Sequence, residues 1–195
     1  MTVASSRPAG ADRHDSGCKV KMPLPPGVTG SAIFRGERDE HRLVLERRFA
    51  DLTISADPEA FALWLGMNPS GAEADVNDLT IVKECTWTKR LGFRRYVKGN
   101  AGTYRWTDST TLNASRCVLS HPDNLPVLRA LAAEAGIIVL ATGKPPERLL
   151  PDVAALFDAL KSDGRTVHCL GTTKDGWPKH SSRLGYGTPF VEYQL

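Results

Sequence analysis

The sequence predicts a three-layer α/β/α fold with a mostly parallel central sheet and an N-terminal β-hairpin. Two observations lead to this prediction. From residue 61 onward, short apolar segments alternate with segments of helical periodicity, and such alternation produces right-handed crossovers between parallel strands. The segments that follow the apolar runs are polar and contain glycine, which is typical of loops.

The N-terminal part of the chain is expected to hold a flexible arm and a hairpin. The arm covers residues 1–29, which contain four prolines and show no apolar periodicity. Residues 30–195 are then expected to form a single α/β domain. The hairpin is expected from segments 31–34 and 43–49, because a polar stretch separates two apolar runs.

The remaining elements are expected in regular alternation. Five consecutive apolar residues predict a buried strand over 61–66. Asp78 has the residue type of a helix N-cap and Gly92 that of a helix stop, so a helix is expected over 78–91. The same patterns predict a strand over 93–99, a helix over 124–135, a strand over 136–141, a helix over 150–161 and a strand over 166–170.

Composition limits the class of protein. With 41% hydrophobic and 24% charged residues, the chain has the composition of a soluble globular domain. It has no apolar run of the roughly 20 residues that a membrane helix needs and no signal-peptide pattern. We therefore expect a cytoplasmic monomer with no membrane partner.

The sequence also argues against metal, cofactor and triad chemistry. The four cysteines are scattered without C-x-x-C spacing, and the five histidines have no ligand-like spacing. Walker-type, dinucleotide-binding and nucleophile-elbow motifs are absent from the sequence. The expectation is a site without a metal or a cofactor.

The segment after the first buried strand is the strongest candidate for a site. Gly66 permits a close ligand approach, and Pro69 restricts the backbone of Asn68 to extended geometry. An amide held in this way can orient a water or bind the polar edge of a ligand. The alternative is that Asn-Pro-Ser-Gly forms a turn and nothing more.

Position within the fold extends this argument to other loops. In open α/β sheets, ligands bind beyond the carboxyl ends of the strands. The segments expected to leave those ends are 66–78, 99–108, 141–146 and 170–186. A ligand site is therefore expected where these four segments meet.

A group of cations and aromatic residues is concentrated in a short span, from the end of the first expected helix to residue 106. Such a mixture binds phosphates and stacks on bases, although the net charge of +3 does not by itself establish nucleic-acid binding. The alternative is that the charges are solvated and the rings belong to the core. The group consists of Lys89, Arg90, Arg94, Arg95, Lys98 and Arg105 with Trp87, Phe93, Tyr96, Tyr104 and Trp106.

From about Ala32 to Leu195 the sequence resembles the domain-of-unknown-function family numbered 1643. The motifs that carry the resemblance are 65–70 (LGMNPS), 78–81 (DLTI), 100 with 104–108 (N and YRWTD), and 170–180 (LGTTKDGWPKH). The family normally continues after the last His with Pro-Leu-Tyr, whereas this chain has Ser181, Ser182 and Arg183. We therefore expect the last loop to bind a different ligand from the one bound by other members of the family.

A weaker resemblance, to the uracil-DNA glycosylase superfamily, implies a fold and a chemistry. That superfamily has a four-stranded parallel α/β fold with a water-positioning Asn or Asp after the first strand, a base-reading Asn after the second and a DNA-contacting His or Asn after the last. Gly66-Met67-Asn68-Pro69 is similar to the first motif, Asn100 to the second and His180 to the third. The resemblance implies a uracil-DNA-glycosylase-like domain that binds DNA.

The resemblance also implies roles for single residues. Asn68 would position a water, Asp78 or Asp75 would act as a base or support the cationic sugar, and His180 would donate to the departing base. For Asp78 the alternative is a simple N-cap. The other expected base or substrate contacts are Gly66, Met67, Pro69, Ser70, Asn100, Tyr104 and Arg105, and the expected DNA-backbone contacts are Lys89, Arg94, Lys174, Lys179 and Arg183.

The substrate expected from this reading is a modified pyrimidine. In uracil-specific enzymes a Tyr after the Pro excludes 5-substituents, whereas Ser70 and Gly71 occupy that neighbourhood here. The sequence thus predicts excision of a 5-substituted base, such as a hypermodified base of phage DNA, leaving an abasic site. The alternatives are a hydrolase or transferase of free nucleotides and a non-catalytic module that binds a modified base.

Overall fold

The protein, represented by a computed structural model that describes residues 21–50, 57, 59–108 and 116–195, is built around a seven-stranded mixed sheet. The strand order is β2-β3-β6-β4-β7-β8-β9. The strands are β2 (Val28–Arg35), β3 (His41–Phe49), β4 (Phe61–Gly66), β6 (Arg95–Asn100), β7 (Ile137–Leu140), β8 (Val167–Cys169) and β9 (Val191–Tyr193). Two short strands, β1 (Met22–Pro23) and β5 (Val76–Asn77), pair separately.

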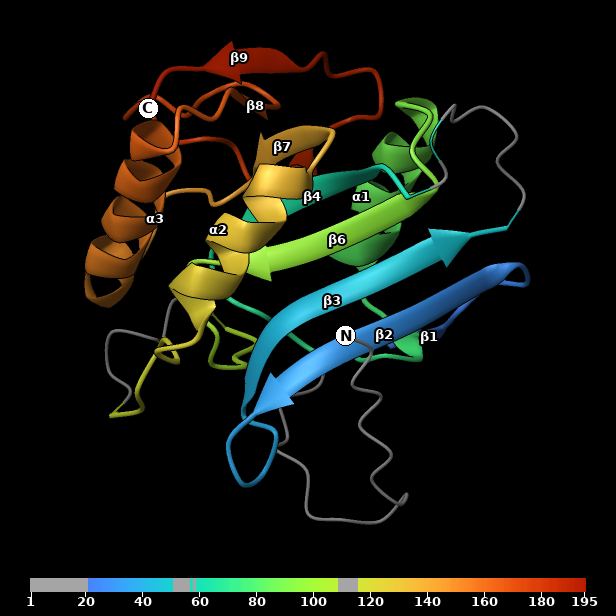
Figure 1. Cartoon of the computed structure of the whole chain (residues 1–195), viewed down its shortest axis with the longest axis horizontal. Coiled ribbons are helices and arrows are strands. Elements are labelled where there is room, and N and C mark those ends of the chain that lie inside the picture. The colour runs from blue at the N-terminus through green and yellow to red at the C-terminus, as the bar shows by residue number, and fades with distance from the viewer. Residues whose placement is uncertain (1–20, 51–56, 58, 109–115) are drawn as a thin grey trace.

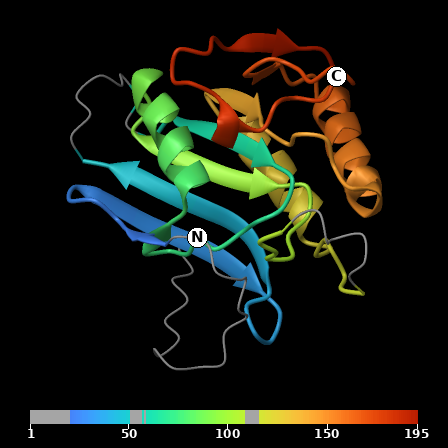
Figure 2. The ribbon, with the colours of Figure 1, turned by 180° about the vertical axis from the view of Figure 1, so that it is seen from behind.

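Helices cover both faces of this sheet. The helices are α1 (Leu79–Arg90), α2 (Asn124–Glu134) and α3 (Leu150–Ser162), with short 3₁₀ turns η2 (Glu147–Leu149) and η3 (Ser181–Arg183). Helices α2 and α3 lie in front of the sheet in Figure 1, and α1 lies behind it, as the reversed view in Figure 2 shows. The predicted three-layer arrangement is therefore present.

The core divides at the sheet in the same way. Leu63 on β4 belongs to a buried cluster with Leu128 of α2 and Leu156 of α3. Its neighbour Trp64 belongs to a second buried cluster, with Trp87 of α1. Because successive strand residues point to opposite faces, the continuous apolar run of β4 supplies both halves of the core.

The prediction of a mostly parallel sheet is wrong for the sheet as a whole. The pairings β4–β6, β4–β7 and β7–β8 are parallel, but β2–β3, β3–β6 and β8–β9 are antiparallel. The hairpin joins one edge through β3, and the C-terminal strand β9 joins the other. Only the central strands β6, β4, β7 and β8 form the expected parallel unit.

Most expected elements occur within two residues of their predicted bounds. The strand over 61–66 and the starts of the helices at 124 and 150 agree with the structure, and α1 is flanked by Asp78 as N-cap and by Gly92 with a φ of 84°. The strand expected from 93 begins at Arg95, since the residues before it complete the turn that ends α1. Strands β1, β5 and β9 were not predicted because they have only two or three residues each.

The expected arm lies partly outside the described residues, which begin at residue 21. Within the described part, Met22–Pro23 pairs with β5, and β2 begins at Val28. The boundary expected at residue 30 therefore falls inside a strand. Among the described residues, no helix has the length and apolar character that a membrane crossing requires.

Two buried arginines on β3 hold the segment that leads from β4 to α1. Arg47 donates to the carbonyl oxygens of Glu73 at 2.6 Å and Val76 at 2.9 Å and to Oδ1 of Asn77 at 2.8 Å. Arg42 donates to the carbonyl oxygen of Ala72 at 2.6 Å. Both arginine side chains are almost fully buried, so this segment is attached to the sheet through satisfied backbone acceptors.

Candidate active site

A cavity of about 540 Å³ lies at the carboxyl ends of the parallel strands. The chain runs from β4 through α1 to β6 on one side and then through α2 to β7 on the other side, so the strand order reverses at β4. Such a reversal is the usual ligand position in an open α/β sheet. The cavity is lined by Arg42, Gly66, Met67, Asn68, Ser70, Asp78, Thr80, Ile81, Lys98, Asn100, Trp106, Thr107, Gly143, Lys144, Thr173, Lys179, His180, Ser182, Arg183 and Leu184.

The lining has a buried end and an exposed end. We call the buried residues Arg42, Gly66, Asp78, Lys98 and Asn100 the inner end, and the exposed cations Lys144, Lys179 and Arg183 the mouth. All four predicted loop segments contribute to this lining. A volume of this size falls in the range of cavities that bind small organic ligands.

Asn68 is fixed by the neighbouring loop. Its side-chain Nδ2 donates to the carbonyl oxygen of Trp106 at 2.8 Å and to that of Pro69 at 3.1 Å. The backbone N–H of Trp106 in turn donates to the carbonyl oxygen of Pro69 at 2.9 Å. With both amide hydrogens engaged by backbone, Oδ1 is the atom of this side chain that can accept a hydrogen bond from a water or a ligand.

Lys98 and Asn100 lie on either side of Gly99 in β6 and therefore face the same side of the sheet. A Cβ atom placed on Gly66 would lie 2.6 Å from Oδ1 of Asn100 and 2.9 Å from Nζ of Lys98. Glycine is therefore required at position 66 for the two polar groups to approach β4. Asn100 is 2% exposed, and its Nδ2 has no hydrogen-bond partner among the described residues.

Glu84 of α1 is the shared hydrogen-bond acceptor of three buried side chains next to the cavity. Its Oε1 accepts hydrogen bonds from Nζ of Lys98 at 2.9 Å and from Oγ of Ser181 at 2.7 Å, and its Oε2 accepts one from the hydroxyl of Tyr96 at 2.7 Å. All four side chains are buried. Burial, followed by the charge of Glu84, raises the pKa of Tyr96 well above its usual value, so the tyrosine remains a donor to this carboxylate.

Asp78 caps helix α1 and also lines the cavity. Its Oδ1 accepts a hydrogen bond from the backbone N–H of Ile81 at 3.0 Å, which is the bond expected of an N-cap. The side chain is 7% exposed and contributes to the inner end. Asp75, the other carboxylate considered for catalysis, is exposed and is not part of the lining.

His180 begins the 3₁₀ turn η3 and lies at the edge of the cavity. Its Nδ1 accepts a hydrogen bond from the backbone N–H of Ser182 at 3.2 Å and lies 2.8 Å from Oγ of that serine. A neutral imidazole that accepts at Nδ1 carries its proton at Nε2. Lys83 of α1 holds the turn in place by donating to the carbonyl oxygens of Ser182 and Leu184 at 2.8 and 2.6 Å.

The cavity is rich in positive charge. Arg42 and Lys98 are buried at the inner end, and three more cations surround the mouth, against Asp78 as the acidic residue of the lining. Burial lowers the pKa of Arg42 to about 10, so its guanidinium is still charged near neutral pH. Lys144 at the mouth pairs with Asp175 at 2.7 Å, both side chains being exposed. An anionic ligand fits this distribution.

Two hydroxyl groups add hydrogen-bonding capacity beside Asn68. Oγ of Ser70 and Oγ1 of Thr107 are buried without a hydrogen-bond partner in the described ranges, and both residues line the cavity. Buried hydroxyls normally have partners. The two atoms can therefore bond to a polar group of a ligand.

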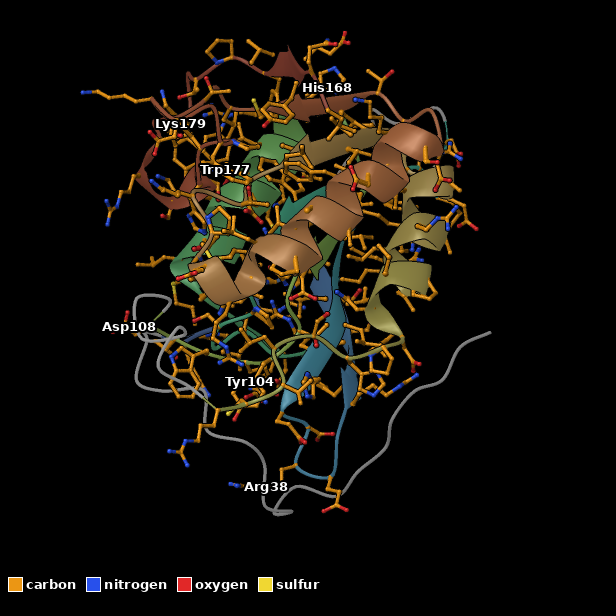
Figure 3. The ribbon with its side chains drawn as sticks, turned by 90° about the vertical axis from the view of Figure 1, so that its left-hand side faces the viewer. Arg38, Tyr104, Asp108, His168, Trp177 and Lys179 are labelled. Atoms are coloured by element: carbon orange, nitrogen blue, oxygen red, sulfur yellow. The ribbon has the colours of Figure 1, made fainter. Side chains whose placement is uncertain are left out.

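The structure does not bring all predicted residues to the cavity. Arg105 is buried in an ion pair, with Nη2 at 2.8 Å from Oε1 of Glu73. Tyr104 packs edge to face with His41, at a ring distance of 5.6 Å, and Figure 3 shows it well away from Lys179. Other predicted contacts that do not line the cavity are Pro69, Lys89, Arg94 and Lys174.

The group of cations and aromatic residues does not form one surface. Trp87 and Tyr96 are core residues, and Arg95 pairs with Glu46 at 3.1 Å. Within the group, only Lys98 and Trp106 line the cavity. Strand β6 separates the group because alternate residues of a strand face opposite sides.

A model of the family described as "Protein of unknown function (DUF1643)" matches residues 42–181. The match covers 140 of the 195 residues. The chain belongs to the DUF1643 family. No curated protein matches the sequence, and no solved structure matches the fold.

The residues matched to DUF1643 contain the whole inner end of the cavity, whereas Ser182 and Arg183 lie just beyond the match. The match also contains two of the three cations of the mouth, Lys144 and Lys179.

Several residues of this DUF1643 site were not predicted. Arg42 and Lys144 were not considered, and Lys98 was named only as a member of the cationic group. Glu84 falls within the helix expected over 78–91 but was not singled out. A usable signal was present for two of them, since Arg42 directly precedes the apolar run 43–45 and Lys98 directly follows Val97, and buried charges need a partner.

The residue types at the cavity indicate the kind of ligand that it can bind. Across the described ranges, no three His, Cys, Asp or Glu side chains are arranged to hold a metal ion. The polar groups that line the cavity are mostly amides, hydroxyls and cations, which favour an organic anion or a polar heterocycle.

Proposed function

We propose that this DUF1643 protein is a DNA glycosylase that excises a 5-substituted pyrimidine base and leaves an abasic site. The observation that carries the proposal is the shared cavity. Asn68, Asp78, Asn100 and His180 come from three separate loop regions and line one space with a cationic mouth. The central four parallel strands, with these residues at their carboxyl ends, are similar to the arrangement that the glycosylase resemblance implies.

The residues of the cavity supply the groups that the reaction needs. In hydrolysis the oxygen of a water bonds to C1′ of the sugar, the glycosidic bond breaks with its electron pair passing to the base, and the water gives up a proton. Oδ1 of Asn68 orients the water, and the carboxylate of Asp78 accepts the proton and stabilises the cationic sugar. His180 donates from Nε2 to the departing base.

A base reaches this cavity only after it leaves the helical stack. Nδ2 of Asn100 has no protein partner within the described structure, so it is available to the flipped base. Lys144, Lys179 and Arg183 at the mouth are exposed and bind the flanking phosphates. DNA is thus the partner of the mouth and the base is the ligand of the inner end.

The lining beside Asn68 supports a substituted base. Ser70 and Thr107 are small, and their hydroxyl groups are buried without partners among the described residues. A polar 5-substituent, such as a hydroxymethyl or glycosyl group, would provide the missing hydrogen bonds. This is why we propose a modified pyrimidine in preference to uracil.

A second candidate is a hydrolase that acts on free nucleotides. It is favoured by the clustering of the three exposed cations at one opening, since the phosphates of a single nucleotide would satisfy them. The choice between the two depends on whether the base is released from a polymer or from a monomer.

An abasic-site assay tests the proposal. Duplexes that carry plain, methylated, hydroxymethylated or glucosylated pyrimidines are incubated with the protein and then cleaved with an abasic endonuclease. We expect nicking of one class of modified DNA, its loss in Asn68→Ala, and its retention in the control Lys161→Ala on α3. Base release from free nucleotides alone would favour the second candidate, and release from neither would overturn both.

A further inference from the structure

We propose that the inner end of the cavity contains a subsite for an oxyanion, formed by the guanidinium of Arg42 with the hydroxyls of Ser70 and Thr107, and that this subsite binds an anionic group on the substituent of the base. The proposal rests on the glycosylase function above. It specifies the charge of the 5-substituent, which that function leaves open.

Arg42 reaches the cavity from the N-terminal hairpin. It is the second residue of β3, which lies beside β6 in the sheet (Figure 1) and runs antiparallel to it, with Leu45 opposite Lys98. The beginning of β3 is therefore at the same edge of the sheet as the carboxyl end of β6. The backbone N–H of Arg42 donates at 2.9 Å to the carbonyl oxygen of Thr103, in the loop after β6. The hairpin thus places a cation where the parallel strands end.

Protein groups offset the burial of this charge only in part. The Arg42 side chain is almost completely buried, and an uncompensated buried charge is unfavourable. Burial lowers the pKa of Arg42 more than the charge of Asp78 raises it, and the charges of Arg105 and Arg47 lower it further, to about 10. Oδ1 of Asp78 already accepts the backbone N–H of Ile81. An additional anion beside the guanidinium would therefore be stabilised.

The guanidinium also has hydrogen-bond donors that the protein leaves unused. Nη1 of Arg42 donates to the carbonyl oxygen of Ala72 at 2.6 Å, which holds the side chain in place. Nε is buried without a hydrogen-bond partner within the described ranges. The five N–H donors of an arginine form a planar fork that matches the oxygens of a carboxylate or a phosphate. Because Arg42 lines the cavity, an oxyanion there can bind this fork.

Two hydroxyl groups complete the subsite. Ser70 is two residues before Ala72, the residue to which Arg42 is bonded. Thr107 follows Trp106, whose backbone N–H donates at 2.9 Å to the carbonyl oxygen of the residue before Ser70. The hydroxyls of Ser70 and Thr107 are buried without partners among the described residues, and both residues line the cavity. They add two O–H donors to those of the guanidinium, and an oxyanion can accept from all of them.

An anion fits this set of donors better than a neutral group of the same shape. Hydrogen bonds that involve an ionised partner are roughly twice as strong as those between neutral groups. A carboxylate presents acceptors only, whereas a carboxamide presents an NH₂ group whose hydrogens would face the donors of the subsite. The subsite should therefore distinguish a carboxylate from a carboxamide of equal size.

The test uses two bases of the same shape and different charge. Duplexes carry 5-carboxymethyluracil or its neutral amide, 5-carbamoylmethyluracil, at one position, and excision is measured under single-turnover conditions. We expect the carboxylate to be excised faster by about tenfold or more, the factor that corresponds to one charge-assisted hydrogen bond. Equal rates, or faster excision of the amide, would overturn the proposal while leaving glycosylase activity established.

Variants of Arg42 separate its charge from its contact with the loop. Arg42→Gln removes the charge but keeps an amide that can donate to Ala72, and Arg42→Lys keeps the charge. If Arg42 binds the oxyanion, the folded Gln variant excises the two bases at similar rates, and the Lys variant retains a preference for the carboxylate. If Arg42 only supports the loop, both variants slow the two bases equally and the proposal fails. The control Lys179→Gln, at the mouth, should slow both bases and keep the preference.

Binding provides a readout that does not depend on turnover. Calorimetry measures the affinities of 5-carboxymethyl-2′-deoxyuridine and its neutral amide for the wild type and for Ser70→Ala/Thr107→Val, which leaves Arg42 and its contact with Ala72 in place. A preference for the carboxylate that decreases in the double variant supports the proposal even where no base is released. Lack of any preference in the wild type contradicts it, whatever the outcome of the abasic-site assay.

A further ligand distinguishes the two sources of an oxyanion. The phosphate of a free nucleotide has the same chemistry as an anionic substituent, so the affinity of 2′-deoxyuridine 5′-monophosphate is measured in parallel. Weaker binding of this nucleotide than of the carboxylate nucleoside is expected. Tighter binding that is lost in Arg42→Gln would assign the subsite to a nucleotide phosphate and overturn its assignment to a substituent of the base.

Discussion

Nδ2 of Asn68 donates to the backbone carbonyl oxygen of Trp106 at 2.8 Å and so joins the loop after β4 to the loop after β6. The hydrogen bond fixes both the position of the amide and its orientation, because Nδ2 is directed to backbone and Oδ1 is left for a ligand or a water. A residue that orients a water by position alone must be held in this way.

Removal of the Asn68 amide is expected to abolish turnover. Asn68→Ala should lower the single-turnover rate constant by about 10²-fold or more, because the water loses its orienting acceptor. DNA affinity should change only slightly, since the cations of the mouth remain. Quench-flow and equilibrium titration measure the two quantities, and an unchanged rate constant would remove Asn68 from the mechanism.

Asp78 has two roles that substitutions can separate. Asn is as good an N-cap as Asp, so Asp78→Asn should retain the stability of α1, whereas Asp78→Ala should cost about 1 kcal/mol of the free energy of unfolding. If the carboxylate accepts a proton, both variants lose activity. Full activity in Asp78→Asn would show that the residue is a helix cap and nothing more.

Lys179 at the mouth is expected to contribute to phosphate binding. In Lys179→Ala the slope of the logarithm of the DNA association constant against the logarithm of salt concentration should fall in magnitude by about 0.9, the value for one neutralised phosphate. Lys161→Ala, which removes a charge from the last turn of α3 and outside the cavity lining, should leave the slope unchanged. Equal slopes in all three proteins would argue against a DNA contact at Lys179.

Arg47 is expected to be essential for stability. Arg47→Met leaves several buried carbonyl oxygens and Oδ1 of Asn77 without a donor, which should lower the free energy of unfolding by about 3 kcal/mol or more. The neighbouring Arg48 forms exposed pairs with Glu46 and Glu59, so Arg48→Met should cost about 0–1 kcal/mol. Urea unfolding measures the free energy of unfolding of both variants. Equal losses in the two variants would show that the segment between β4 and α1 does not depend on Arg47.

Stability is expected to fall in alkaline solution. Burial raises the pKa of the Cys85 thiol from 9.0 to about 12, so above pH 9 the unfolded state loses this proton while the folded state retains it. The folded state is then disfavoured by roughly 1.4 kcal/mol for each pH unit between these two values. Cys85→Ala should be less stable near neutral pH but should show a flatter decline, and an unchanged decline would show that other groups cause it.

The sequence was sufficient for the central part of the fold but not for its edges. The run 61–66 has a pattern that depends on local residues alone, and it is strand β4 as predicted. Strand β9 has three residues and exists because β8 offers an antiparallel partner. Such a pairing is decided by tertiary contact, which local pattern does not contain.

The candidate site was also predictable from the sequence only in part. Asn68 and Asn100 lie at or just after the carboxyl ends of β4 and β6, so sheet topology alone brings them together. His180 lies well beyond the end of β8, at the start of the turn η3 that Lys83 of α1 holds in place. Arg42 and Lys98 are located by their contacts with Ala72 and Glu84, and those partners are 30 and 14 residues away in the sequence. Charged strand residues could have been suspected from their apolar neighbours, but their partners could not.

The carboxylate of Glu84 joins a helix, a strand and the turn that follows His180. A change at any one of positions 84, 96, 98 and 181 leaves a buried group unmatched, whereas coordinated changes can keep the set balanced. In an alignment of DUF1643 sequences, these four positions should therefore vary together or not at all. Members that have lost the lysine should also have lost the glutamate.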